Sequence, residues 1–428
     1  MSIIGIDIGT TSICGIAIDE SNGDVIKSIE KNNNAFIATE RSWEKIQSVE
    51  KIITLAQNIL SELLSDDTKA IGVTGQMHGI LYYDADGNPI SPLYTWQDGR
   101  GNLEYKNTTY AKYLNSFSGY GNVTDFYNRE NNRVPDGAVG YCTICDYLVM
   151  KLCGLKKTLM HSSNAASLGC FDIEKNRFDY DCDIDVTADY AIAGEYKGIP
   201  VSVAIGDNQA SVFSTLADED DILLNVGTGS QVSVISDIPV VAENIETRPY
   251  FDGKYLIAGS ALCGGRAYSM LKDFYAEILG YVENVDSGRV YDIMNKMLEK
   301  SDKTSMTVKT RFAGTRSNSG LCGSIEGITT ENFKPSDLTL GVLEGMVLEL
   351  FEMFTLMGVK RNGIVGSGNG IRKNQALIRA FEKKFDAKMK IPKHVEEAAF
   401  GAALFALMSC GEIQNKMKKS ELIKYSDR

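Results

Sequence analysis

The chain has 428 residues, a formal net charge of −12 and 43% hydrophobic residues. Its length predicts two domains, and its negative charge argues against nucleic acid or an anionic membrane as a partner. No apolar run approaches the roughly 20 residues that a membrane span needs. The N-terminus has no basic leader, so we expect a cytoplasmic protein.

The N-terminal residues predict a β-hairpin. The stretch "IGIDIGTTSICGIAID" reads as an apolar strand, a glycine-rich turn and a second apolar strand, with Asp7 inside the first strand. Glycines that leave a strand often bind phosphate through backbone amides, although the lysine of the usual phosphate-binding loop is missing here. A buried group that merely caps the turn is the alternative interpretation of Asp7.

Long helices and further strands follow, which predicts a mixed α/β core. Helical spacing of apolar residues predicts a helix over 43–64, and "AIGVTGQMHGILYYD" predicts a strand that breaks at Gly75 and resumes. Helical spacing in "YCTICDYLVMKLC" places Cys142, Cys145 and Cys153 in one helix. Because the nine cysteines are scattered and odd in number, we expect reduced, core-packed thiols rather than a metal or redox site.

A second hairpin repeats the first. "GIPVSVAIG" predicts a strand, and the helix after it has Asp207 as its N-cap. "DILLNVGTGSQVSVIS" then runs again as strand, Gly-Thr-x-Ser turn and strand, with Asn225 at the position of Asp7. Unless the likeness of two common turns is chance, the repeat predicts two related domains that face each other, which we place at 1–213 and 214–428.

The second half predicts a long helix, a glycine-rich loop and a small-residue helix. "NFKPSDLTLGVLEGMVLELFEMFTLMG" has Pro335 just before the helix, Ser336 or Asp337 as its cap and Gly358 at its end. "GIVGSGNGIRKNQALIRAFEKKFD" reads as strand, loop and helix, and "EEAAFGAALFALMSCG" as a helix whose small residues pack closely.

The turns suggest how phosphate and a metal could be bound. Two facing Gly-Thr turns could hold a polyphosphate, and a third loop at 366–370 could approach a nucleoside closely. Without a lysine, the charge of a transferred phosphoryl group would need Mg²⁺, for which Asp7 is the natural carboxylate because Asn225 is neutral. Asp207, at the start of its helix, could accept a proton from an attacking hydroxyl, whether or not it also caps the helix.

Two polar loops are typical of a sugar site. "TGQMHG" at 74–79 and "TWQDGR" at 95–100 place amide, imidazole, indole and charged groups in short segments that glycine bounds. Such groups suit the hydroxyls and the C–H face of a sugar. We expect His78 to bind rather than to catalyse, and the three histidines have no spacing typical of a zinc site.

These motifs resemble the FGGY carbohydrate kinases over essentially the whole chain. "GIDIGTTS", "TGQMHG", "TWQDGR", "IGDNQA", "NVGTGSQV", "GSALCGG" and "GSGNGIRKN" occur in the family's order. "SSNAASLGCFD" and "RPYFDGKYL" are most similar to the family's sedoheptulokinase branch, whereas "GQMHG" is shared with xylulokinases. The resemblance implies an α/β fold of two related actin-like ATPase (ribonuclease H-like) domains with a cleft between them. It also implies ATP-dependent phosphorylation of a ketose at its terminal hydroxyl, with sedoheptulose as the ketose and xylulose or ribulose as alternatives.

The resemblance implies roles for single residues as well. Asp207 would be the general base, with Asn208 beside it, and Asp7 would hold Mg²⁺ through water. ATP would be bound by Thr10, Thr11, Gly227, Thr228, Gly229, Ser230, Gly368, Asn369 and Asn374. The ketose would be surrounded by Gln76, Met77, His78, Trp96, Asp98, Arg100, Asp207 and Asn208. Two departures, Gly-Thr-Gly-Ser in the second turn and Gly-Ser-Gly in the adenosine loop, concern the nucleotide contacts and not the class.

Two other classes of protein fit the sequence less well. An actin-like nucleotide-switch ATPase would explain the phosphate hairpins but not the two sugar-type loops, and an inactive sugar sensor would not need Asp7 and Asp207. A kinase would bind the sugar on its first domain and ATP mainly on its second, and would close about a hinge near residue 214. Its partners would be the ketose and ATP; whether it forms a homodimer stays open.

Overall fold

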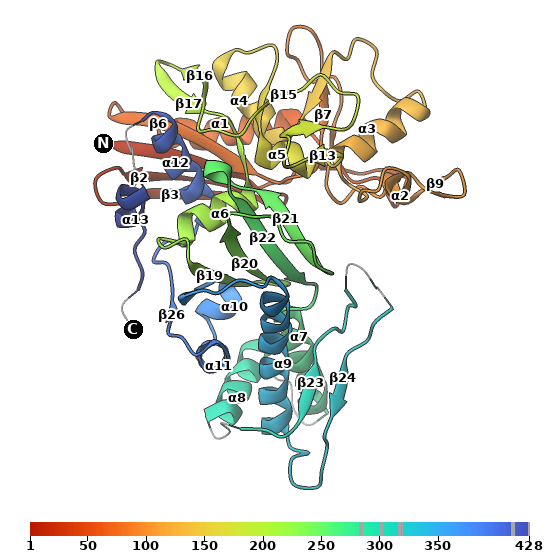
Figure 1. The fold of residues 1–428 in the computed structure, drawn as a ribbon, viewed down its shortest axis with the longest axis vertical. Coiled ribbons are helices and arrows are strands. Elements are labelled where there is room, and N and C mark those ends of the chain that lie inside the picture. The colour runs from red at the N-terminus through yellow and green to blue at the C-terminus, as the bar shows by residue number, and fades with distance from the viewer. Residues whose placement is uncertain (282–285, 300–302, 316–317, 319, 412–415, 427–428) are drawn as a thin grey trace. The chain divides into compact units, whose positions relative to one another are not determined.

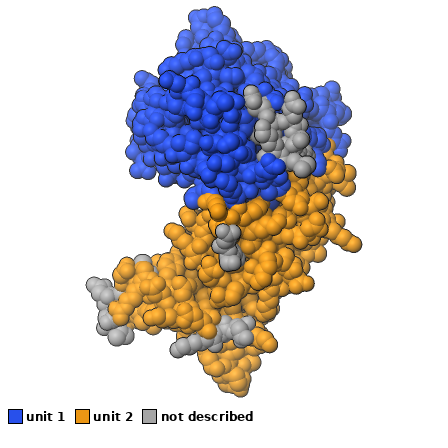
Figure 2. Space-filling model, turned by 90° about the vertical axis from the view of Figure 1, so that its left-hand side faces the viewer, with its two compact units in different colours: residues 1–217, 248–254, 394–424 blue, residues 218–247, 255–393, 425–428 orange. Residues whose placement is uncertain are grey.

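The chain forms two compact units (Figure 2). The computed structural model describes residues 1–281, 286–299, 303–315, 318, 320–411 and 416–426. Unit 1 comprises Met1–Ala217, Arg248–Lys254 and His394–Lys424, and unit 2 comprises Asp218–Thr247, Tyr255–Lys393 and Tyr425–Arg428. Both units are discontinuous, whereas the boundary placed from the sequence divides the chain once. Within the described residues, no helix is long and apolar enough to cross a membrane.

Unit 1 is built on a mixed sheet (Figure 1) with the strand order β16-β17-β6-β1-β2-β3 and with β18 beside β6. β1 is antiparallel to β2 and parallel to β6, so the C-terminal ends of β1 and β6 lie at the same edge of the sheet. The predicted first hairpin and the break after Gly75 are confirmed. The strands are β1 (Ser2–Ile8), β2 (Ser12–Asp19), β3 (Val25–Asn32), β6 (Thr68–Gly75), β16 (Ile192–Tyr196), β17 (Ile199–Ser202) and β18 (Ile205–Gly206).

Three helices of unit 1 hold the first hairpin and Asp207 in place. α1 (Val49–Leu63) buries its apolar face against β1 and β2. α12 (Glu397–Ser409) packs on β1 and β6 and also against α6 (Asp207–Thr215). A Cβ atom on Gly401 of α12 would lie 1.9 Å from the Ala210 carbonyl oxygen, so only glycine permits this approach. The predicted close packing of this helix is confirmed, and it fixes the position of α6.

Unit 2 has a second sheet with the same plan, in the order β21-β22-β20-β19-β25-β26. β19 is antiparallel to β20 and parallel to β25, as β1 is to β2 and β6. In the two registers Asp7 lies beside Thr74, and Asn225 lies beside Ser367. The repeat predicted from the sequence is therefore present in the sheets. The strands are β19 (Asp221–Val226), β20 (Ser230–Ser236), β21 (Ile245–Pro249), β22 (Tyr255–Ala261), β25 (Gly363–Ser367) and β26 (Met389–Lys390).

Five described helices and this second sheet enclose an apolar core that is rich in Leu, Met and Val. The helices are α7 (Gly265–Gly280), α8 (Ser287–Glu299), α9 (Pro335–Leu356), α10 (Asn369–Arg372) and α11 (Gln375–Phe385). The other described elements are β4 (Phe36–Ile37), β5 (Ile46–Gln47), β7 (Leu81–Tyr83), β8 (Leu93–Tyr94), η1 (Arg100–Asn102), β9 (Glu104–Tyr105), β10 (Thr108–Thr109), α2 (Tyr110–Tyr113), α3 (Gly121–Glu130), β11 (Gly140–Cys142), α4 (Ile144–Cys153), β12 (Leu159–His161), α5 (Ser162–Ser167), β13 (Phe171–Asp172), β14 (Arg177–Phe178), β15 (Asp185–Thr187), η2 (Phe251–Gly253), β23 (Thr307–Lys309), β24 (Ser324–Glu326) and α13 (Lys416–Leu422).

Four element boundaries differ from the sequence-based expectation. The first helix begins at Val49 rather than at residue 43, because Ile46–Gln47 pairs with β8 as the strand β5. Cys142 ends β11 and does not belong to the helix that holds Cys145 and Cys153. Pro335 is the first residue of α9, where its missing N–H costs no hydrogen bond.

The fourth difference concerns Asp207, which is the first residue of α6; the N-cap is Gly206.

All nine cysteines are free thiols.

Candidate active site

Asp207 lies where β18 gives way to α6. The Gly206 N–H donates to the Ser163 hydroxyl at 3.0 Å, which fixes the chain just before the carboxylate. Asn208 Nδ2 donates to Asp207 Oδ1 at 3.0 Å and lies 3.8 Å from the Met77 sulfur. Burial raises the pKa of the Asp207 carboxyl, and hydrogen bonds from Asn208 and the charge of Arg248 oppose the rise. A desolvated carboxylate of this kind is suited to accept a proton.

Asp7 is a second desolvated carboxylate in unit 1. Burial raises its pKa to about 7, and the negative charges of Asp207 and Glu396 add to the rise. Among the described residues, no three His, Cys, Asp or Glu side chains are grouped so that they could hold a metal ion directly. A single carboxylate with water ligands is the way proteins commonly hold Mg²⁺, and that arrangement fits Asp7.

His78 is held rigidly in the loop after β6. Its backbone has a φ of 74°, in the left-handed region that few non-glycine residues adopt. The Ser167 hydroxyl accepts from the His78 N–H at 3.1 Å, and His78 Nδ1 donates to the Ser167 carbonyl oxygen at 2.8 Å. The ring stacks on Tyr120 with centroids 4.3 Å apart. A side chain fixed by a hydrogen bond and a ring contact, on a backbone that is itself held, is suited to binding a ligand in one orientation.

Trp96 presents its indole ring to solvent beside the first turn. It is 46% exposed, and its Nε1 donates to the Thr10 hydroxyl at 3.0 Å. That hydroxyl donates in turn to Gln76 Oε1 at 3.3 Å. The structure thus brings together three residues that the sequence singled out from three different motifs.

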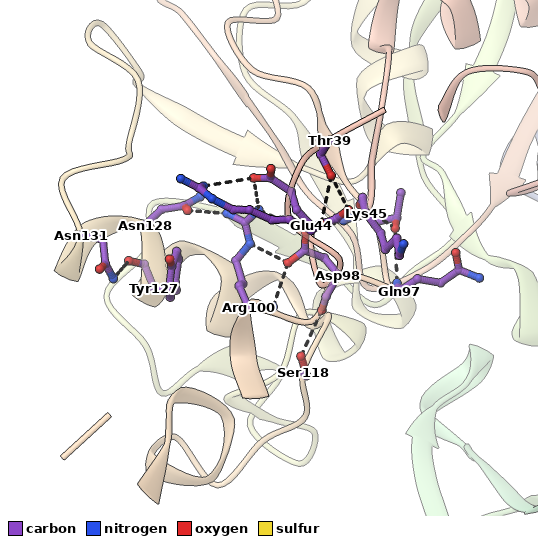
Figure 3. A network of polar contacts seen from close by, with 12 residues as sticks. Thr39, Glu44, Lys45, Gln97, Asp98, Arg100, Ser118, Tyr127, Asn128 and Asn131 are labelled. Atoms are coloured by element: carbon purple, nitrogen blue, oxygen red, sulfur yellow. Dashed lines mark hydrogen bonds and ion pairs between the residues drawn. The ribbon is translucent and has the colours of Figure 1, made fainter. Parts of the chain in front are cut away.

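Asp98 and Arg100 lie in a network of polar contacts (Figure 3). Each is only 1% exposed, and Arg100 binds the Asp98 carboxylate through Nε at 2.7 Å and Nη2 at 3.1 Å. Arg100 Nη1 donates to Asn128 at 2.6 Å, and the guanidinium lies 4.2 Å from the centre of the Tyr94 ring. The charged groups of Asp98 and Arg100 are thus bound by each other and by neighbouring side chains of the same chain. The pair holds the loop that carries Trp96.

The two Gly-Thr turns are anchored from behind through their carbonyl groups. In the first turn Asn33 binds the Gly9 and Thr11 carbonyls, and Gln47 Nε2 donates to the Thr10 carbonyl at 2.9 Å. In the second turn the carbonyls of 227 and 228 accept at 2.9 and 3.0 Å from amides at the start of α7. A Cβ on residue 264 would lie 2.5 Å from Gly229, which explains the double glycine of "GSALCGG".

The second turn borders a cavity of about 920 Å³ in unit 2. Of the predicted ATP-binding residues, Gly227, Thr228, Gly368, Asn369 and Asn374 line it. Gly229 and Ser230 follow in the same turn, and Ser230 is buried as the first residue of β20.

Sequence reasoning missed several residues that line this cavity. Arg266 and Lys373 add positive charge, and Tyr268 stacks on Tyr291 with centroids 5.9 Å apart. Leu343, Met346 and Leu377 supply an apolar wall. Only the position of Arg266, directly after the Gly-Gly pair, was a signal that the sequence offered.

Arg248, in unit 1, was also missed. Gln209 Nε2 donates to the Pro249 carbonyl at 3.1 Å, and Phe251 packs edge-on against Phe213 of α6, with centroids 4.8 Å apart. These contacts hold the segment so that the Arg248 charge interacts with Asp207 and with Tyr120. The residue belongs to "RPYFDGKYL", whose distance along the chain from Asp207 hid the connection.

Solved structures with a similar fold include kinases of xylulose and of glycerol. The fold matches that of a ligand-bound xylulose kinase from Lactobacillus acidophilus with a TM-score of 0.83 and 18% identity, covering 100% of this chain and 93% of that one. For the Plasmodium falciparum glycerol kinase with ADP the TM-score is 0.82 at 19% identity, with the same coverage. These likenesses concern the fold alone.

The family is established by sequence. Residues 2–189 match the N-terminal domain, and residues 222–410 the C-terminal domain, of the FGGY family of carbohydrate kinases. The chain belongs to this family and is a carbohydrate kinase. Sedoheptulokinase from Mus musculus is 29% identical over 94% of this chain and 97% of that protein, and the Homo sapiens protein is 28% identical with the same coverage. A xylulose kinase from Staphylococcus xylosus is 25% identical over 95% of this chain and 90% of that protein.

Proposed function

We propose that the protein transfers a phosphoryl group from ATP to the terminal primary hydroxyl of sedoheptulose, giving sedoheptulose 7-phosphate. The observation that carries the proposal is the desolvated Asp207 carboxylate at the start of α6, with Asn208 bonded to it and Met77 beside it. The sequence likeness to two sedoheptulokinases, higher than to the xylulose kinase, supports the choice of ketose.

Asp207 is the general base in this proposal. In the ionised form its carboxylate accepts the proton of the attacking hydroxyl as the new oxygen–phosphorus bond forms, while the bond between the γ-phosphorus and its bridging oxygen breaks and ADP leaves. Asn208 orients that carboxylate, and the indole of Trp96 with Gln76, Met77 and His78 holds the sugar. Asp98 and Arg100 contribute by keeping the Trp96 loop in shape, as their bonds to each other support.

ATP occupies the cavity of unit 2 in this proposal. The adenine lies among the apolar wall and the Tyr268–Tyr291 pair, and the phosphates lie toward the Gly227–Thr228 turn, Arg266 and Lys373. Gly368, Asn369 and Asn374 border the nucleoside. Thr10 and Thr11 approach the phosphates from the first hairpin, whose turn is anchored from behind. Asp7 holds Mg²⁺ through water, and when bound the ion neutralises phosphate charge. The nine free thiols support a cytoplasmic location.

The test is a coupled assay of ADP release over sedoheptulose, D-xylulose, D-ribulose and glycerol. We expect kcat/KM for sedoheptulose to exceed that for each pentulose by roughly tenfold or more, the usual scale for a contact that only one substrate makes. A higher value for xylulose or ribulose would replace sedoheptulose as the substrate. If no compound raised ADP release above the basal rate, the proposed function as a whole would fail.

A further inference from the structure

Four side chains close a chain of hydrogen bonds around the first turn of unit 1. Trp96 Nε1 donates to Thr10 Oγ1 at 3.0 Å, and Thr10 Oγ1 donates to Gln76 Oε1 at 3.3 Å. Gln76 Nε2 donates to Gln47 Oε1 at 3.0 Å, and Gln47 Nε2 returns to the Thr10 carbonyl at 2.9 Å. We call these four residues the Thr10 ring. Three belong to the proposed sites, whereas Gln47 has no role assigned so far.

The direction of every bond in the Thr10 ring follows from one backbone group. The Thr10 carbonyl can only accept, so the amide nitrogen of Gln47 must face it. The Gln47 oxygen then faces Gln76 and accepts from its nitrogen, which leaves the Gln76 oxygen to accept the hydroxyl proton of Thr10. The indole N–H can only donate, so it completes the chain on the Thr10 oxygen.

This polarity limits what the Thr10 hydroxyl can do. Its only proton is directed to Gln76, and its oxygen accepts from Trp96. The hydroxyl therefore has no proton to give to a phosphate oxygen while the ring is closed. Contact between this turn and a phosphate is left to the backbone amides, the groups that such turns normally use.

Burial keeps the polarity in place. Gln47 is 0% exposed and Gln76 is 6% exposed, so water cannot readily replace a broken bond, and an unpaired amide there is costly. Trp96 is 46% exposed and has less packing to hold it. The hydrogen bond from the indole N–H to Thr10 is accordingly an important restraint on the Trp96 indole, which faces the sugar in the proposed function.

We propose that Gln47 is a positioning residue of the sugar site. Through the Thr10 ring it sets the direction of the Thr10 hydroxyl, which fixes the indole of Trp96 for the ketose. The side chain of Thr10 thus serves the sugar, and the backbone of the same turn serves the phosphates. The inference rests on the proposed function for the identity of the two ligands. Its physical core, that Gln47 restrains Trp96, does not.

The experiment uses the full chain with Trp43→Phe, so that Trp96 is the only tryptophan. Acrylamide quenching of its fluorescence is measured first without ligand, in the parent and in Gln47→Leu, Gln47→Glu, Thr10→Val and Thr10→Ser. We expect quenching to increase in the first three and to stay near the parent in Thr10→Ser, which keeps a hydroxyl. The KM values for ketose and for ATP are then measured separately.

For Gln47→Leu and Thr10→Val we expect the KM for the ketose to rise roughly fivefold to tenfold, the scale of one net hydrogen bond, with the KM for ATP within about twofold. Asn33→Leu is the matched control, because Asn33 is buried and binds the Gly9 carbonyl of the same turn but lies outside the ring. It should alter the KM for ATP and leave the quenching of Trp96 unchanged.

Unchanged quenching of Trp96 in folded Gln47→Leu and Gln47→Glu would overturn the proposal, whatever the substrate. A KM for ATP that rises in Thr10→Val as much as the KM for ketose would overturn the assignment of the hydroxyl to the sugar. A parent protein that turns over no ketose would refute the proposed function alone, because the quenching comparison still decides the role of Gln47.

Discussion

The β1–β2 and β19–β20 hairpins share one plan, and one of their differences lies inside the first strand, where Asp7 corresponds to Asn225. Asn225 lies beside Ser367 across the parallel strand pair and donates to its hydroxyl at 2.7 Å. Asp7 lies beside Thr74, whose hydroxyl instead donates to the Ile205 carbonyl at 2.8 Å. The Asn225 side-chain amide thus has a hydrogen-bond partner on the neighbouring strand, whereas the hydroxyl beside Asp7 is directed elsewhere. The exchange of Asp7 for Asn225 thus gives only the first hairpin an ionisable group at this position.

The surroundings of the two turns continue this difference. At the first turn, burial raises the pKa of Asp7, and the negative groups Asp207 and Glu396 add to the rise. Two cations, Arg266 and Lys373, line the cavity beside the second. In the proposed function, Arg266 and Lys373 balance phosphate charge at the second turn, and Mg²⁺ held by Asp7 does so at the first. The Asp7→Asn prediction below tests this division of roles, and the other predictions test the proposed base and the two ligand sites.

The largest effect is expected for Asp207→Asn. The asparagine side chain keeps the shape of aspartate and should leave sugar binding intact. It cannot accept the proton of the attacking hydroxyl, so kcat should fall roughly 10²–10⁴-fold. Because burial raises the pKa of the wild-type carboxyl, wild-type kcat should also decline as the pH falls through that raised pKa and the base becomes protonated. The pH profile of kcat and the sugar affinity by calorimetry check both points. A variant with near-wild-type kcat would remove Asp207 from the role of base.

Asp7→Asn makes the first hairpin like the second. We expect the Mg²⁺ concentration for half-maximal rate to rise about 10–100-fold, the scale for a lost partner of a bound metal. The same variant should be more stable than wild type without ligands at pH 8. Burial raises the pKa of Asp7 in the folded state to about 7, well above the ordinary value of an aspartate. Ionisation at pH 8 therefore disfavours the folded state, and the asparagine removes this penalty.

A Mg²⁺ titration of the rate and thermal unfolding at pH 5 and pH 8 are the measurements. An unchanged titration would contradict the metal role even if the stability rose.

The elements that local patterning determines were predictable, and the contacts between distant segments were not. Both hairpins and the helix of small residues follow from glycine placement and apolar spacing. The burial of Asp98 and Arg100 depends on Asn128 and Tyr94, which no motif connects to them. Charged residues in a polar loop suggested a ligand, whereas the fold pairs them with each other.

The cavity of unit 2 is likewise lined both by residues that the sequence predicted and by residues that it did not. The loop that holds Gly368 was predicted because a glycine-rich segment leaves a local signature, and Asn374 was predicted through the family resemblance. The stacking of Tyr268 on Tyr291 joins two separate helices, α7 and α8. Aromatic residues at helical spacing are normally core residues, so only their place beside a cavity distinguishes these two.

A smaller and more selective effect is expected at the two glycines that end matching strands. Gly75 ends β6 with a φ of 152°, and Gly368 follows β25 with a φ of 82°. A Cβ would lie 2.5 Å from the Ile8 carbonyl oxygen at Gly75 and 2.6 Å from that of Val226 at Gly368. Alanine at either position must therefore displace its turn.

If the loop after β6 serves the ketose and the loop after β25 serves ATP, Gly75→Ala should raise the KM for ketose about tenfold. Gly368→Ala should raise the KM for ATP by the same factor. The other KM in each variant should change about twofold or less. Gly137→Ala is the matched control, because Gly137 has a φ of 83° but no atom within 4 Å of its added Cβ. It carries the backbone strain without displacing a turn, so it should lower the unfolding temperature and leave both KM values unchanged. Equal effects of Gly75→Ala and Gly368→Ala on both substrates would show that the turns act as one site, and the division between sugar turn and nucleotide turn would have to be given up.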